Sequence, residues 1–205
     1  SKKDCPVKVG DVAAFDRPFI EMGNRLVAKS MDDRAGVLVA IETLRALTLR
    51  HAQGSPYDVY FVFTTQEEVG VRGAGTSAFG VDPDVGIAID VTPTADTPNA
   101  MKMEMVLGKG PCVKFQDAGT ISDPRVVKWM IQTAEKSKIP YQREVLLFGG
   151  TDARAMQMTR AGVPVGCLSI PVRYVHSPSE MVDYTDVQNS VKLLTALLRT
   201  PIDLG

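Results

Sequence analysis

The sequence has 205 residues, enough for one domain around a single hydrophobic core. Its 23 lysines and arginines balance 24 aspartates and glutamates, which excludes the basic surface expected for binding nucleic acid or anionic membranes. The three cysteines are widely spaced and no apolar run or signal-peptide pattern suggests a membrane span or export, so we expect a cytoplasmic protein.

The first part of the chain, to about residue 28, is rich in Val, Phe, Pro and Gly and predicts short strands and turns, such as residues 7–15. From Asp33 onward, apolar residues recur at helical spacing, which predicts a helix just after two aspartates. The segment YDVYFVFTT, residues 57–65, is β-branched and aromatic and predicts a buried central strand.

The rest of the chain continues this alternation of strands and helices. Two strands are expected to pair across a Gly-Lys-Gly turn, and Asp123 is expected to begin a helix. The predicted elements in chain order are a helix over 73–80, strands over 85–90, 103–107 and 111–115, a helix over 124–136, a strand over 141–148, a helix over 152–162, a strand over 163–170 and a helix over 186–199. The alternation predicts an α/β fold with a mostly parallel, mixed sheet sandwiched by helices.

Acidic residues and one histidine fall at the expected carboxyl ends of strands or at the start of a helix. These residues are Asp32, Asp33, Glu67, Glu68, Asp90 and His176. In open α/β sheets, ligands bind at this edge, where loops gather polar side chains. Carboxylates with one imidazole suit zinc, manganese or cobalt better than calcium. The pattern therefore indicates a transition-metal site.

Each residue also has a simpler explanation. The Asp32-Asp33 pair can cap a helix, and Asp90 can begin an Asx turn. Adjacent glutamates can be a solvated strand end, and His176 can be a hydrogen-bonded loop residue. The only other histidine, His51, lies in a polar stretch and is interpreted as a surface residue. The site hypothesis rests on the convergence of separate segments.

Five segments, taken together, resemble the M42 metallo-aminopeptidases. They are SMDDRAG, TTQEEVGVRGAGTSAFG, AIDVTPTAD, GGTDA and RYVHSPSEMVD, and the resemblance runs from about Val9 to Leu198. It implies a zinc-exopeptidase-like fold and hydrolysis of the N-terminal residue of short peptides. It also implies two divalent metal ions, zinc or cobalt with manganese as a third choice, and a homo-oligomer that is a dodecamer in intact family members.

The resemblance also implies a role for each site residue. Asp32 would bridge the two ions, Glu68 and His176 would bind one of them, and Asp90 would bind the other. Glu67 would be the general base. A cis peptide bond between Asp32 and Asp33 is a further expectation from the family.

The sequence departs from the family pattern in one respect. The family carries a second histidine ligand in an upstream His-x-Asp segment, which this sequence lacks. Residues 1–22 are interpreted as the remnant of an inserted small β domain, and residues 23–205 as the carboxy-terminal portion of the catalytic α/β domain. We therefore expect an incomplete fold and a chain that begins inside a longer protein.

Two other functions are compatible with these residues. One is a noncatalytic subunit of the same fold that holds at most one metal ion. The other is a glycoside hydrolase that uses the paired acids Glu67 and Glu68. The latter is disfavoured because adjacent strand residues point to opposite faces of a sheet and rarely flank one glycosidic bond.

Overall fold

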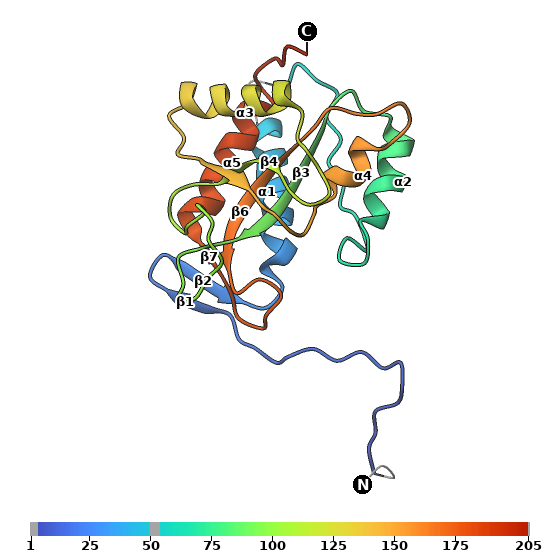
Figure 1. The fold of residues 1–205 in the computed structure, drawn as a ribbon, viewed down its shortest axis with the longest axis vertical. Helices are drawn as coiled ribbons and strands as arrows, with labels where there is room; N and C mark the ends of the chain where they lie inside the picture. Colours follow the sequence, from blue (N-terminus) through green and yellow to red (C-terminus); the bar gives the residue numbers. More distant parts are fainter. Residues whose placement is uncertain (1–3, 50–53, 205) are drawn as a thin grey trace.

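The computed structural model describes residues 4–49 and 54–204, so His51 lies outside the described residues. These residues form one sheet and the helices that cover it (Figure 1). The strands are β1 (Ile20–Met22), β2 (Arg25–Ala28), β3 (Gly86–Pro93), β4 (Cys112–Gln116), β5 (Gln142–Val145), β6 (Val165–Arg173) and β7 (Glu180–Asp183). The helices are α1 (Met31–Thr48), α2 (Arg72–Val81), α3 (Pro124–Lys136), α4 (Ala153–Gln157) and α5 (Tyr184–Leu197). In the part of the chain that is described, no helix has the length and hydropathy needed to cross a membrane.

The 7-stranded sheet has the order β1-β2-β7-β6-β4-β5, with β3 paired to β6. The pairs β3–β6 and β4–β5 are parallel, whereas β1–β2, β2–β7, β4–β6 and β6–β7 are antiparallel. The α/β class and the mixed sheet are confirmed. The longest ladder, β3–β6, is parallel, and the short antiparallel strands at the β1–β2–β7 side add pairings that the sequence pattern did not show.

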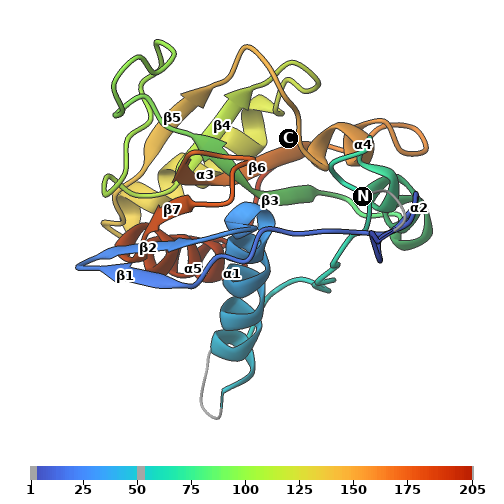
Figure 2. The same ribbon diagram turned by 90° about the horizontal axis from the view of Figure 1, so that it is seen from below.

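Helices cover both faces of the sheet. Helices α1, α3 and α5 lie on one face, and α2 and α4 lie on the other (Figures 1 and 2). Successive side chains of β6 pack on opposite faces of the sheet. Leu168 packs in the larger core cluster, and Cys167 packs in the smaller cluster with Ala153 of α4. A strand buried on both faces reads as a continuous apolar run, as β6 does.

Most predicted helices form where the periodicity placed them. Helix α3 has the predicted bounds, since Pro124 occupies its first turn and the Asp123 carboxylate accepts a hydrogen bond of 2.8 Å from the Arg125 amide. Helices α1, α2 and α5 match their predictions within about two residues at each end. Helix α4 is shorter than predicted and ends at Gln157.

The predicted strand over residues 57–65 does not form. A strand needs a neighbour to bond its backbone, and no segment in the described chain pairs with this one. Several of its large side chains are accordingly exposed, with Tyr60 67% and Phe63 52% accessible, while Tyr57 and Phe61 are half-buried. The apolar pattern alone overestimated its burial.

The predicted strand over residues 103–107 is also absent. Side chains satisfy this backbone instead, since Gln142 bonds both the amide and the carbonyl of Val106 and Asp96 accepts from the Leu107 amide. Strand β3 continues three residues past Asp90, which therefore lies inside the strand rather than at its end.

The amino-terminal part of the described chain leaves the main body as an extended arm over residues 4–19 (Figure 1). The hairpin of β1 and β2 then joins the sheet beside β7. The division into residues 1–22 and 23–205 stays a prediction.

Candidate metal centre

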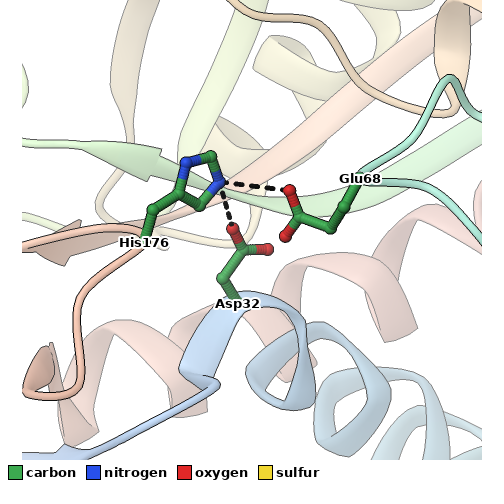
Figure 3. Close-up of side chains that lie close together, drawn as sticks. All are labelled: Asp32, Glu68 and His176. Atoms are coloured by element: carbon green, nitrogen blue, oxygen red, sulfur yellow. Dashed lines mark ion pairs between the residues drawn. The ribbon is translucent and has the colours of Figure 1, made fainter. Parts of the chain in front are cut away.

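Three predicted ligands meet at one point, although they come from separate segments (Figure 3). Asp32 lies at the start of α1, Glu68 in the loop before α2, and His176 in the loop between β6 and β7. The Nε2 atom of His176 is 3.1 Å from Asp32 Oδ2 and 3.2 Å from Glu68 Oε2. One imidazole nitrogen and two carboxylate oxygens thus converge.

A second group joins Asp32 with Asp33 and Asp90. One oxygen from each of these carboxylates lies within 4.8 Å of the other two. Asp32 belongs to both groups, which is the position that a carboxylate bridging two ions would occupy. Asp90 was predicted to bind here, whereas Asp33 was among the candidate residues but was given no ligand role of its own.

The turn that carries the two aspartates is unusual. The peptide bond between Asp32 and Asp33 is cis, so the expectation drawn from the family resemblance is confirmed. The Gly36 amide donates a 3.0 Å hydrogen bond to Asp33 Oδ1, and a side chain at Gly36 would collide with that carboxylate. The glycine of the DRAG segment, Gly36, therefore allows the Asp33 carboxylate to lie close to the backbone of α1.

Glu67 lies beside the cluster but belongs to neither group of potential ligands. Burial, and then the negative charges of Asp152 and Glu68, raise the pKa of Glu67 to about 7. A carboxyl group with this pKa can both accept and release a proton near neutral pH. Glu67 is therefore suited to proton transfer.

Asp152 was noted in the sequence only as part of the GGTDA segment, with no charge role. Its Oδ2 accepts a 2.6 Å hydrogen bond from Thr64 Oγ1, whereas its Oδ1 is buried with no hydrogen-bond partner in the described chain. It is the strongest charged neighbour acting on Glu67. This role depends on folding that brings residues 64 and 152 together, so local spacing gives no signal for it.

The clustered carboxylates disfavour one another's charge. Burial, and then the charge of Glu68, raise the pKa of Asp32 to about 6, while burial and Asp90 raise the pKa of Asp33 to about 9. Burial also raises the pKa of Asp90 well above its usual value. Cations bound among these oxygens would relieve this repulsion, so the residues fit divalent metal ions.

The two groups differ in donor type. The group of Asp32, Glu68 and His176 offers oxygen and nitrogen, as zinc and cobalt sites do. The group of Asp32, Asp33 and Asp90 offers oxygen alone.

Comparison with known proteins identifies the family. The model for M42 glutamyl aminopeptidases matches residues 1–193. The chain belongs to the M42 family. A putative aminopeptidase of Acetivibrio thermocellus is 44% identical over 188 residues, which are 92% of this chain and 56% of that protein. This chain thus spans little more than half the length of that relative.

Solved M42 structures share the fold. An aminopeptidase from the archaeon Desulfurococcus kamchatkensis superposes with a TM-score of 0.90 at 43% identity, covering 96% of this chain and 55% of that one. The TET1 peptidase of Pyrococcus horikoshii, described as able to assemble into a tetrahedron or a large octahedral shell, gives a TM-score of 0.76 at 31% identity, covering 91% and 54% of the two chains.

Proposed function

We propose that this chain carries the metal centre of an aminopeptidase that removes the N-terminal residue of short peptides. The observation that carries the proposal is the meeting of Asp32, Glu68 and His176 from three segments, with His176 Nε2 3.1 and 3.2 Å from the two carboxylates. Membership of the M42 family supports the same activity.

Two divalent ions are assigned to the centre, zinc or cobalt with manganese as a third choice. Asp32, Glu68 and His176 would hold one ion, and Asp32 would share the other with Asp90. When bound, such ions supply Lewis-acid chemistry and lower the pKa of water towards neutrality.

Glu67 is assigned the proton transfers. Its carboxylate would take a proton from the attacking water and deliver it to the amide nitrogen that departs. Its pKa of about 7 suits both steps, and its place next to Glu68 puts it beside the ligands without making it one. One side chain thus serves as base and then as acid.

A second function is favoured by one observation. The group that includes Asp90 contains only carboxylates in the part of the chain that is described. With no imidazole there, the chain could hold a single ion at the His176 group and be noncatalytic. The two candidates therefore differ in metal stoichiometry and in turnover.

The assembly and location are proposed from the relatives and the composition. The Pyrococcus horikoshii relative can assemble into a tetrahedron or a large octahedral shell, so we assign this chain to a homo-oligomer, the dodecamer being the form of the intact family protein. Its near-neutral charge and its three widely spaced cysteines fit a cytoplasmic protein.

The test is hydrolysis of a panel of aminoacyl chromogenic substrates with added zinc, cobalt or manganese and after chelation. We expect metal-dependent release of the chromophore. The variant Glu67→Gln should lose about 100- to 10,000-fold in kcat, since general acid-base catalysis contributes on that order.

The control is Glu135→Gln, which makes the same chemical change at an exposed position on α3. It should keep full activity. A folded chain that binds one ion and hydrolyses nothing with any metal would support the noncatalytic alternative instead.

A further inference from the structure

Glu180 is a buried carboxylate whose two oxygens bond the backbone of two candidate ligands. It opens β7 and is 2% exposed. The Asp32 amide donates to its Oε2 at 3.0 Å, and the His176 amide donates to its Oε1 at 2.8 Å. A single side chain therefore links the start of α1 to the loop after β6.

Glu180 is anchored in the sheet by its pairing with β2. Strand β7 lies between β2 and β6, and Glu180 pairs with Ala28 of β2. A side chain that starts from such a position has little freedom, so its carboxylate provides a rigid reference point for the two loops above it.

Neither backbone that Glu180 holds is helical, and that of His176 has an uncommon conformation. His176 has a φ of 62°, in the left-handed region that non-glycine residues rarely adopt. Asp32 has φ −77° and ψ 108°, which is not helical although the residue lies at the start of α1. A left-handed backbone such as that of His176 persists where surrounding contacts determine it. The bonds to Glu180 are such contacts.

We propose that Glu180 is a positioning residue, which fixes the backbones of Asp32 and His176 so that their side chains converge on one metal ion. This inference rests on the proposed metal centre. An ionised carboxylate suits the role because it has acceptors on both oxygens and no donor. An amide in its place would turn an NH2 group towards one backbone N–H and leave that donor without an acceptor.

Asp186 provides a matched comparison. It is 0% exposed and, like Glu180, accepts two backbone bonds, from the Gly108 and Gly110 amides at 2.7 Å each. Neither glycine is a candidate ligand. The variant Asp186→Asn therefore repeats the chemical change and the loss of fold stability without touching the ligands.

The first experiment measures cobalt affinity by calorimetry for the chain and for Glu180→Gln, Glu180→Asp and Asp186→Asn. We expect Glu180→Gln to weaken binding about 10- to 100-fold, as changes behind metal ligands usually do. Glu180→Asp keeps the charge but shortens the reach, so it should also weaken binding about tenfold or more. Asp186→Asn should stay within about threefold of the parent chain.

The second experiment needs no metal. Amide hydrogen exchange of the metal-free chain should show the Asp32 and His176 amides protected, with that protection lost in Glu180→Gln and kept in Asp186→Asn. In Asp186→Asn the Gly108 and Gly110 amides should lose protection instead.

Three results would overturn the inference. They are equal loss of affinity in Glu180→Gln and Asp186→Asn, full affinity in Glu180→Asp despite loss in Glu180→Gln, and unprotected Asp32 and His176 amides in the parent chain. The second of these would show that Glu180 acts through its charge rather than its position. Failure of the parent chain to bind any divalent ion would instead contradict the proposed function. The hydrogen-exchange data would then still show whether Glu180 protects the Asp32 and His176 amides.

Discussion

Carboxylates gather at two places in the fold, and the two groups differ in the cations that lie beside them. Inside the sheet, Lys114 Nζ lies 2.9 Å from Glu144 Oε1 and 3.7 Å from Asp117 Oδ2, and all three side chains are at most 2% exposed. At the candidate metal centre, five carboxylates face one another and the ion-pair partner of Asp32 and Glu68 is the single imidazole of His176.

The comparison shows how buried acids are made tolerable. Removing a carboxylate from water costs free energy unless a cation and hydrogen bonds compensate it. The Lys114 cluster carries its own cation and a further hydrogen bond, 2.8 Å long, from Thr92 Oγ1 to Glu144 Oε1. At the metal centre, protons raise the tolerance for the buried acids when no ion is bound, and the proposed ions would replace those protons.

The largest effect is expected from removing the internal cation. Lys114→Met should lower the free energy of unfolding by about 3 to 5 kcal/mol, because it leaves Glu144 and Asp117 buried without their partner. Urea denaturation measures this. Adding Glu144→Leu to the same chain should restore part of the loss.

The control is Lys128→Met on the exposed side of α3, which should change stability by less than about 0.5 kcal/mol. Equal effects of the two methionine variants would mean that the buried lysine is not compensating the acids around it.

A pH dependence should distinguish the metal centre. The folded-state pKa values of Asp32 and Asp33, about 6 and about 9, lie above the ordinary value of 3.8. The folded chain therefore binds these protons more tightly than the unfolded chain does. Without metal, the free energy of unfolding should fall as pH rises from about 5 to about 9, by at most about 1.4 kcal/mol per pH unit for each proton.

Asp33→Asn should reduce this slope, most clearly above about pH 7 where Asp32 and Glu67 no longer contribute, and added zinc or cobalt should reduce it in the parent chain. Urea midpoints at several pH values in a chelator provide the measurement. An identical slope in the variant would show that Asp33 is not the group responsible.

The smallest effect on stability is expected at a half-buried ion pair. Arg173 donates two hydrogen bonds, of 2.9 and 2.8 Å, to the Asp96 carboxylate, and the side chains are 24% and 18% exposed. Arg173→Lys should cost about 1 kcal/mol, since lysine cannot make both parallel bonds. Arg45→Lys, in the exposed pair with Glu42, should leave the melting temperature unchanged.

Local patterns predicted the elements that depend on local causes. Helix α3 follows from Asp123, Pro124 and an apolar stripe, all readable along the chain. Strand β6 follows from a continuous apolar run. Strand β7 was missed because its four residues, Glu180–Asp183, carry no such run and owe their conformation to pairing with β2 and β6. The prediction over 57–65 was wrong for the opposite reason. That run has the pattern of a strand, but no segment of the described chain pairs with it.

The residues of the candidate site likewise include some that local sequence patterns predicted and some that they did not. The placement of acids after predicted strands indicated Glu67, Glu68 and Asp90, and the family resemblance supplied their separate roles. The contributions of Asp152 and Glu180 could not be predicted from spacing, since each acts on a residue far away in the sequence. Such contacts arise only when the fold brings the segments together.

The most direct test of the metal centre is the cobalt and zinc stoichiometry of the chain, compared with His176→Ala and with His51→Ala, which changes the other histidine of the sequence. We predict at least one tightly bound ion per parent chain, loss of that ion in His176→Ala and no change in His51→Ala. A parent chain that binds no ion, or a His176→Ala variant that binds as tightly as the parent, would contradict the assignment of Asp32, Glu68 and His176 as a metal site.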